Sequence, residues 1–122
     1  MGNTVTSRVN VEAITKQVDD NPVMMYTREN CQFCTQAKQL LFEENIKYKE
    51  CNLDALKRES KSADYSGIVN GLVYKTSVTS VPQIFICGKF VGGFVDLEKL
   101  KHSRKLLELL SECTGENSKY EE

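Results

Sequence analysis

Residues 23–43 read VMMYTRENCQFCTQAKQLLFE, and this stretch joins an apolar run to a helical pattern through two cysteines. The run at 23–27 is bounded by turn residues, which predicts a short buried strand. After Cys31 the apolar residues recur at helical spacing among polar ones, which predicts an amphipathic helix from Gln32 to about Asn45. Cys31 and Cys34 therefore lie where a strand ends and a helix begins.

The C-Q-F-C spacing of Cys31 and Cys34 is typical of a redox-active dithiol. At a helix start, unpaired N–H groups and the positive end of the macrodipole favour a thiolate over a thiol. A cysteine with a pKa of ~8.5 is only about 3 per cent ionised at pH 7, whereas the pKa of a cysteine at a helix start can fall to roughly 3.5–7. We therefore expect Cys31 to be the nucleophile.

Two alternatives exist for this cysteine pair. Two-residue spacing also occurs in structural zinc sites, but these need four ligands, and the chain has a single histidine and no second cysteine pair. A structural disulfide is the other alternative, although so short a loop constrains the unfolded chain little. The residues favour redox chemistry. We expect Cys51 and Cys87 to be free, buried cysteines that behave as small hydrophobic side chains.

Length and charge limit the remaining functions. The 122 residues, 40% of them hydrophobic, fit one compact domain. A net charge of −1 gives no reason to expect a nucleic-acid partner. No apolar run approaches the ~20 residues of a transmembrane helix, and the first twenty residues lack the apolar centre of a secretory signal. An odd number of cysteines suits a reducing compartment, so we expect a cytoplasmic protein.

The two ends of the chain differ from its centre. Residues 1–6, M-G-N-T-V-T, match the N-myristoylation pattern with Gly2 as the acceptor. A single acyl chain without basic neighbours would give only weak, reversible membrane association. We expect residues 1–8 to form a flexible N-terminus, residues 9–114 the folded domain, and residues 115–122 a disordered acidic tail.

Hydrophobic spacing predicts the other helices and the second strand. A first helix is expected from Val9 to Val18, and a strand parallel to the first one at residues 46–51. Residues 54–74 suggest helix with an interruption at 60–66.

The C-terminal half predicts a hairpin and a closing helix. Residues 83–87 and 90–91 are expected to pair through a turn at Gly88-Lys89, and Asp96 is expected to cap a single helix that follows. The order strand, helix, strand, helix, hairpin, helix predicts the α/β class and a thioredoxin-like fold, with a four-stranded mixed sheet flanked by helices on both faces.

Two further motifs suggest a ligand site. A cis Val81–Pro82 bond would turn the backbone of Val81 toward the cysteines, where it could pair with an extended, peptide-like ligand; the alternative is an ordinary loop proline. At residues 92–96, two glycines allow close approach, and Asp96 with helix-start N–H groups would bind both charges of an amino-acid head group. The alternative for residues 92–96 is a turn followed by a helix N-cap with a purely structural role. Arg28 would place a positive charge beside the thiolate or a ligand carboxylate, unless it is simply solvated.

Together Arg28, C-Q-F-C, T-S-V-P-Q-I-F-I and G-K-F-V-G-G-F-V-D closely resemble the glutaredoxin family, over about residues 9–113. The chain looks most like the dithiol members of the vertebrate mitochondrial type. The resemblance implies a glutathione-dependent thiol–disulfide oxidoreductase that reduces protein–glutathione mixed disulfides and low-molecular-weight disulfides. Cys31 would be its nucleophile and Cys34 its dithiol partner. The resemblance to the mitochondrial type also makes the mitochondrion an alternative location to the cytoplasm.

The resemblance implies glutathione as reductant and partner, with glutathionylated or disulfide-containing proteins as substrates. Arg28 would hold the glycine carboxylate of glutathione, Val81 its cysteine backbone, and Val95 with Asp96 its γ-glutamyl end. The implied glutathione-binding residues are Arg28, Phe33, Ser80, Val81, Pro82, Gly93, Val95 and Asp96.

The chain departs from the family pattern at a few positions. Gln32 stands where the family often has proline, and some members without that proline hold a 2Fe–2S cluster between two protomers and two glutathiones. The alternative function is therefore that of a 2Fe–2S cluster-binding protein with Cys31 as a ligand. The chain would then be a dimer. As an oxidoreductase it is expected to be a monomer and to require no metal. Val69 replaces a glutamine or arginine that commonly helps to bind glutathione, and Thr79-Ser80 replaces a pair that is usually more basic.

Cys113 matches a C-terminal cysteine that, in the mitochondrial type, can join a cysteine near the N-terminus. This chain has no cysteine before Cys31, so that disulfide is not expected. A thioredoxin-like protein reduced by a flavoenzyme is a further alternative, although the C-G-P-C motif usual for it is absent.

Overall fold

A four-stranded mixed sheet forms the centre of the computed structural model, which describes residues 9–115. The strand order is β2-β1-β3-β4. Strand β1 runs parallel to β2 and antiparallel to β3, which pairs antiparallel with β4. The bounds are β1 Val23–Thr27, β2 Lys49–Asn52, β3 Gln83–Ile86 and β4 Lys89–Gly92. The predicted mixed sheet and the direction of its second strand are confirmed. The predictions for residues 1–8, including lipidation of Gly2, and for 116–122 lie outside the described residues.

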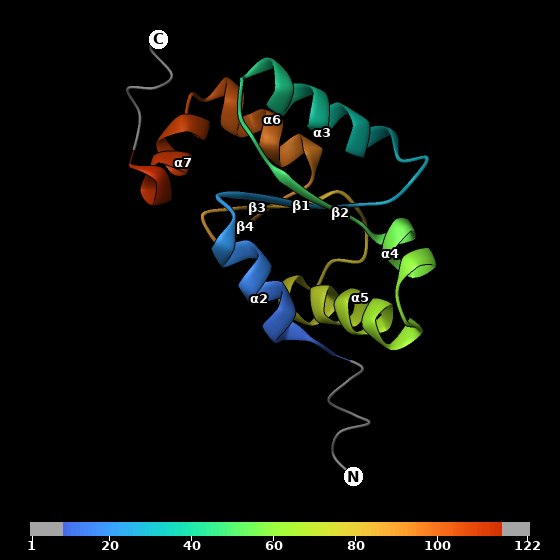
Figure 1. The fold of residues 1–122 in the computed structure, drawn as a ribbon. Coiled ribbons are helices and arrows are strands. Elements are labelled where there is room, and N and C mark those ends of the chain that lie inside the picture. Colours follow the sequence, from blue (N-terminus) through green and yellow to red (C-terminus); the bar gives the residue numbers. More distant parts are fainter. Residues whose placement is uncertain (1–8, 116–122) are drawn as a thin grey trace.

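Helices cover both faces of the sheet, as predicted (Figure 1). Their bounds are α2 Val11–Asp20, α3 Gln32–Glu43, α4 Leu53–Glu59, α5 Ser62–Thr76, α6 Phe94–His102 and α7 Leu106–Thr114. In β1, Val23 and Met25 face the cluster under α3, α6 and α7, while Met24 and Tyr26 face the cluster with α2, α4 and α5. Successive strand residues point to opposite faces. Strand β1 is therefore buried along its whole length and gives the following cysteines a rigid base.

Strand β2 begins at Lys49, three residues later than predicted, because residues before it form the C-terminal cap of α3. Asn45 adopts a positive φ of 60°, and the N–H of Ile46 donates to the carbonyl of Leu41 at 2.9 Å. Such a left-handed residue after a helix satisfies its last carbonyls. Ile46 is buried in the core as part of this helix stop and not as part of the strand.

The helical region after β2 is more regular than predicted. Only Ser60 and Lys61 separate α4 from α5, so the interruption expected at 60–66 is much shorter. Gly71 lies inside α5, where an added Cβ would stand 2.7 Å from Cδ1 of Ile14 and 3.1 Å from the carbonyl oxygen of Asn10. Glycine at this position lets α5 approach the N-terminal segment and α2 closely.

The hairpin turn lies one residue earlier than predicted. Cys87 and Gly88 both have positive φ, at 51° and 80°, and Ile86 pairs with Lys89. Two left-handed residues are typical of a tight two-residue hairpin turn. The C-terminal helix is also divided in two, because Arg104 adopts a φ of 65° between α6 and α7. Helix α7 thereby turns back and buries Leu106 and Leu110.

A disulfide joins Cys87, in the hairpin turn, to Cys113 in the last turn of α7. The prediction that Cys87 is a free cysteine was therefore wrong. The pattern of the chain did not reveal this pairing, because it depends on the division between α6 and α7. Cys51 is free, as predicted, and half-buried. Burial, and then the negative charge of Glu50, raise the pKa of its thiol.

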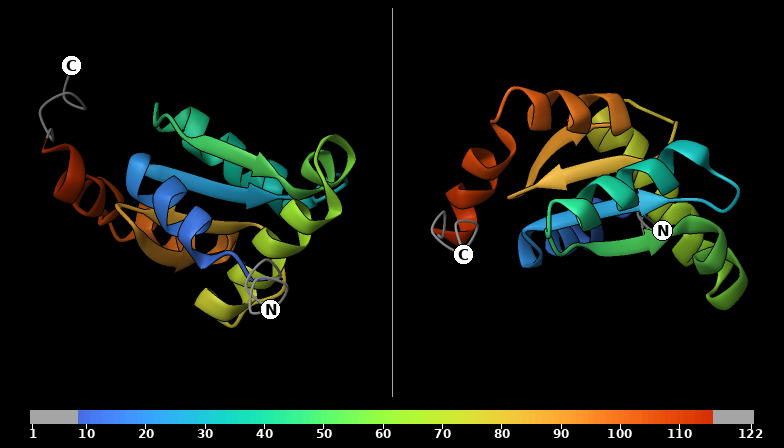
Figure 2. Two further views of the ribbon diagram at one scale, coloured as in Figure 1. Left: turned by 60° about the horizontal axis from the view of Figure 1, so that its bottom comes forward. Right: turned by 90° about the horizontal axis from the view of Figure 1, so that it is seen from above.

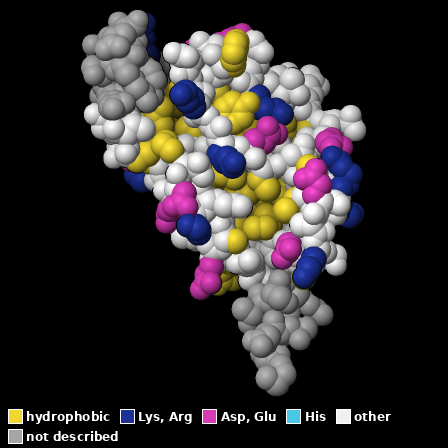
Figure 3. Space-filling model, in the orientation of Figure 1, with side chains coloured by type: hydrophobic (Ala, Val, Ile, Leu, Met, Phe, Trp, Pro, Cys, Tyr) yellow, Lys and Arg dark blue, Asp and Glu magenta, His cyan; other side chains and the backbone are white. Residues whose placement is uncertain are grey.

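Acidic and basic side chains are interspersed on the face shown in Figure 3, with apolar patches between them. Among residues 9–115, no helix is long and apolar enough to cross a membrane.

Candidate active site

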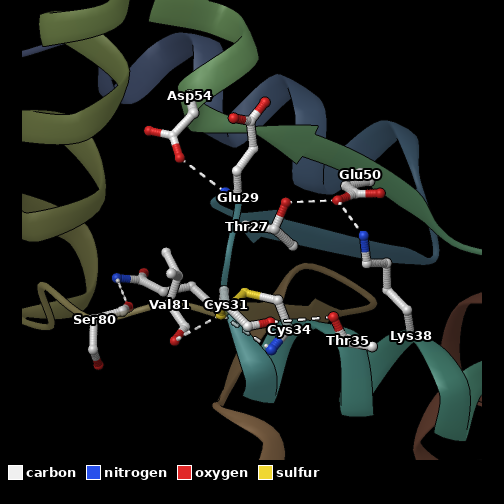
Figure 4. Close-up of a disulfide and its surroundings, with 11 residues drawn as sticks. Thr27, Glu29, Cys31, Cys34, Thr35, Lys38, Glu50, Asp54, Ser80 and Val81 are labelled. Atoms are coloured by element: carbon white, nitrogen blue, oxygen red, sulfur yellow. Dashed lines mark hydrogen bonds and ion pairs between the residues drawn. A yellow bond between two sulfur atoms is a disulfide. The ribbon is translucent and has the colours of Figure 1, made fainter.

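Cys31 lies at the junction of β1 and α3, where it is the N-cap residue of the helix. Its sulfur accepts a hydrogen bond from the N–H of Cys34 at 3.1 Å, and the two sulfurs form a disulfide with a Cα–Cα distance of 5.2 Å (Figure 4). Cys31 is half-buried, whereas Cys34 is only 1% exposed. An incoming molecule therefore meets Cys31 first. After reduction, the helix-start N–H groups would favour a thiolate at this sulfur.

Arg28 is held by an ion pair that the sequence did not predict. Its guanidinium donates from Nη1 to Oδ1 of Asp54 at 2.9 Å and from Nη2 to the hydroxyl of Tyr65 at 2.8 Å. Asp54 also accepts the N–H of Glu29 at 2.8 Å, and this bond, followed by the contact with Arg28, lowers the pKa of its carboxyl. Asp54 thus fixes the loop that leads to Cys31 (Figure 4).

A second polar network fixes the ends of β1 and β2 next to the cysteines. Thr27 donates its hydroxyl to Oε2 of Glu50 at 2.6 Å, and Nζ of Lys38 lies 3.0 Å from the same oxygen. Burial alone would raise the pKa of Glu50, but the hydrogen bonds from Thr27 and Lys38 and the charge of Lys38 outweigh it, so the pKa is lowered. This network ties α3 to both parallel strands.

The Val81–Pro82 bond is cis, as predicted. The carbonyl oxygen of Val81 lies 3.9 Å from the sulfur of Cys31. Val81 also lines a groove of about 570 Å³ between the cis bond, β4 and the start of α6. The groove is lined by Phe33, Val78, Ser80, Val81, Pro82, Phe90, Val91, Gly92, Gly93, Phe94, Val95 and Asp96.

The far end of the groove is the start of α6. Gly93 is the N-cap residue, and its N–H donates to Oδ2 of Asp96 at 3.0 Å. Asp96 therefore occupies the third helical position and not the cap itself, which corrects the prediction. An added Cβ on Gly92, which has a φ of 127°, would overlap the Asp96 carboxylate, so glycine is needed there. The ring of Phe33 stacks on Phe94, with 6.2 Å between ring centroids, and is 53% exposed.

The chain matches the family model described as Glutaredoxin at residues 23–91. It is 36% identical to the mitochondrial glutaredoxin-2 of Bos taurus, over all of this chain and 73% of that protein. The corresponding protein of Homo sapiens is 35% identical, over 92% of this chain and 65% of its own length. The chain belongs to the glutaredoxin family.

Solved glutaredoxin structures have the same thioredoxin-like fold, which confirms that prediction. A buckwheat glutaredoxin–glutathione complex has a TM-score of 0.74 and 26% sequence identity, and covers 85% of this chain and 89% of its own. The holo form of glutaredoxin C1 from Populus tremula x tremuloides has a TM-score of 0.76 and 27% identity, over 87% and 90% of the two chains. Family and dithiol together make this glutaredoxin a thiol–disulfide oxidoreductase.

The structure of this glutaredoxin brings most of the predicted ligand residues together. Seven of the eight line the groove: Phe33, Ser80, Val81, Pro82, Gly93, Val95 and Asp96. The exception is Arg28, which lines a separate depression of about 660 Å³ together with Cys31, Cys34 and Lys38. Val69 packs against the core under α2 and α5 and does not line the groove.

Sequence reasoning missed several residues of the site, among them Asp54, Tyr65 and Phe94. Asp54 and Tyr65 contact Arg28 across 26 and 37 positions of sequence, which no local pattern reveals. Phe94 was detectable in part, because it stands between the glycine pair and the start of a predicted helix.

Proposed function

We propose that the protein is a glutathione-dependent thiol–disulfide oxidoreductase that reduces glutathionylated proteins and low-molecular-weight disulfides. The observation that carries this proposal is the half-buried sulfur of Cys31 at the start of α3, 3.9 Å from the carbonyl oxygen of Val81, a residue that lines the groove. The buckwheat structure contains glutathione, which supports the same ligand for this chain.

The groove suits a γ-glutamyl tripeptide. The outward-facing backbone of Val81 can pair with the cysteine of glutathione, which brings the glutathione sulfur to Cys31. The start of α6 offers N–H groups for the γ-glutamyl carboxylate, and the exposed Asp96 offers a partner for its ammonium group. Arg28 can hold the glycine carboxylate with the N–H groups that Asp54 and Tyr65 leave unused.

The chemistry is two successive thiol–disulfide exchanges. The Cys31 thiolate attacks the glutathione sulfur of a protein–glutathione mixed disulfide, and the protein leaves as a thiolate that takes up a proton. A second glutathione thiolate then attacks the glutathione sulfur on Cys31, which releases glutathione disulfide and restores the Cys31 thiolate. Cys34 can instead attack Cys31 and form the disulfide of the structure, releasing glutathione as the thiol.

The proposal is tested by treating the reduced Cys34→Ser variant with glutathione disulfide and mapping the adducts by mass spectrometry. We expect glutathione on Cys31 within the shortest reaction time, and removal of that adduct by added glutathione. Absence of an adduct on Cys31, or an adduct that glutathione fails to remove, would overturn the proposal. The Cys31→Ser/Cys34→Ser variant shows which adducts arise at other cysteines.

The cluster alternative stays a prediction. Within residues 9–115, no group of three or more histidine, cysteine or acidic side chains is placed to hold a metal ion. In the arrangement that the family resemblance implies, a cluster would be held by Cys31 of two protomers and two glutathiones. Purification under anaerobic conditions with glutathione would give a brown dimer if this alternative holds, and a colourless monomer if it does not.

The compartment also stays a prediction. Composition led us to expect the cytoplasm, whereas the relatives from cattle and humans are named mitochondrial, which favours the mitochondrial alternative for this chain. Substrate proteins would be those with glutathionylated or exposed disulfide-bonded cysteines.

A further inference from the structure

The disulfide between Cys87 and Cys113 lies at the opposite end of the sheet from Cys31. Val23 at the start of β1 pairs with Ile86, so the turn at Cys87 lies beside the beginning of β1, while Cys31 follows the end of β1. Figure 2 shows α7 at one end of the sheet and the loop between β1 and α3 at the other. The two cysteine pairs therefore cannot exchange disulfides within one molecule.

We propose that Cys87 and Cys113 form a second, slower redox couple. It is oxidised by low-molecular-weight disulfides such as glutathione disulfide and reduced by the corresponding thiol, and its oxidation fastens α7 to the sheet. This proposal concerns cysteines outside the candidate active site and does not depend on the role of Cys31.

The geometry suits both oxidation states. The Cα atoms are 5.4 Å apart, within the usual range for a disulfide. The Cys87 sulfur lies 3.3 Å from the carbonyl oxygen of Leu110, and the Cys113 sulfur 3.7 Å from the same oxygen. As thiols, both could donate to this carbonyl, which also accepts the hydroxyl of Thr114 at 3.1 Å. The N–H of Cys87 donates to the carbonyl of Pro22 at 2.8 Å, a backbone bond that does not involve the sulfur. Oxidation thus requires little backbone movement.

Accessibility sets the order of the steps. Cys113 is exposed and Cys87 is half-buried, so an incoming disulfide meets Cys113 first. The Cys113 thiolate attacks one sulfur of glutathione disulfide and releases one glutathione. The Cys87 thiolate then attacks the Cys113 sulfur and releases the second glutathione. Two protein thiols lose two electrons and two protons, and glutathione disulfide becomes two glutathione thiols.

The electrostatic surroundings of the two pairs are opposite. Cys31 faces the N–H groups at a helix start, whereas Cys87 and Cys113 face the carbonyl groups at a helix end, where the macrodipole disfavours negative charge. The nearby charges do not offset this unfavourable effect on a thiolate. The ammonium group of Lys89 is paired with Glu112 at 2.9 Å, and the carboxylate of Asp19 lies close to Gly88. Fewer thiolates form at this end, so the second couple reacts more slowly.

The test uses the reduced full-length protein, mixed with glutathione disulfide, quenched with an alkylating reagent and mapped over time. We expect the Cys31–Cys34 disulfide first and the Cys87–Cys113 disulfide at least about tenfold later, because one unit of thiol pKa changes the thiolate fraction about tenfold. Added glutathione should then reduce both. Equal or faster oxidation of the second pair, a stable glutathione adduct on Cys113, or a second disulfide that glutathione cannot reduce would each overturn the proposal.

A second measurement tests the fastening of α7. In the Cys31→Ser/Cys34→Ser variant, oxidation by glutathione disulfide should raise Tm by on the order of 10 °C, because the bond closes a long loop of the unfolded chain. The matched control adds Cys113→Ser, which replaces an exposed thiol, and its Tm should not respond to oxidation. No rise in the parent variant, or an equal rise in the control, would contradict this role. Since Cys31 and Cys34 are absent, failure here leaves the proposed oxidoreductase function untouched.

Discussion

At the scale of single residues, the activity depends on the position of one sulfur. Replacing Cys31 by serine removes the thiolate, so Cys31→Ser should lower the rate of deglutathionylation by at least about a hundredfold. Cys34→Ser should keep a substantial share of that rate, because glutathione can resolve the adduct on Cys31. An assay with a glutathionylated peptide measures both variants.

The matched control is Cys51→Ser, which removes a half-buried thiol from a depression that Cys31 does not line and should leave the rate unchanged. Equal loss of activity in Cys31→Ser and Cys34→Ser would contradict the route through a glutathione adduct.

A second prediction at the scale of single residues concerns the effect of Asp54 on stability. The pKa of the Asp54 carboxyl is lower in the folded protein than in the unfolded chain, where it is about 3.9. Its contacts with Glu29 and Arg28 therefore stabilise the fold fully at pH values above about 3.9. This stabilisation is lost as the pH falls through the lower pKa of the folded state. Asp54→Asn should therefore be less stable than the natural chain at pH 7, with the difference shrinking below about pH 4. Urea unfolding at pH 7 and pH 3 measures it.

Asp64→Asn, at an exposed position of α5, is the control for that comparison. A stability difference for Asp54→Asn that is as large at pH 3 as at pH 7 would show that the carboxylate charge is not its cause.

At the scale of helices and strands, Gly71 tests the contact between α5 and α2. Gly71→Ala should lower the free energy of unfolding by about 1 kcal/mol, because overpacking against Ile14 and the backbone of Asn10 outweighs the gain in helix propensity. Thermal or urea unfolding measures the change, with Lys75→Ala at an exposed position of α5 as control. An increase in stability would show that the helices separate easily.

The elements that sequence patterns could predict are those with strong local signals. Strand β1 has the predicted residues, and helix α3 starts at the predicted Gln32 and ends at Glu43, close to the predicted end near Asn45, because an apolar run and an amphipathic repeat are read within one segment. The start of β2, the hairpin turn and the division between α6 and α7 depend on left-handed residues at Asn45, Cys87 and Arg104. A helix end near Asn45 was predicted, and asparagine is common at such positions, but cysteine and arginine give no sign of a left-handed residue. The partners of Arg28 and Cys113 were missed because they are contacts across the fold.

At the scale of the whole molecule, the two cysteine pairs should behave independently, since they lie at opposite ends of the sheet. Energetic effects of distant sites usually add. We expect Cys31→Ser/Cys34→Ser to change the rate of Cys87–Cys113 oxidation by less than about twofold, since the oxidant comes from solution. Alkylation and peptide mapping measure that rate. Strong slowing in the double variant would instead mean that the first pair passes oxidising equivalents to the second, from one molecule to another.

The strand order β2-β1-β3-β4 leaves β2 and β4 with one unpaired side each. An open strand edge can recruit an identical chain and begin polymerisation. Both outer strands are only four residues long, and each starts with an exposed lysine, Lys49 or Lys89. The shortness of both edges, and the ammonium group of Lys49 on the edge of β2, would discourage the sheets of neighbouring molecules from joining at high concentration.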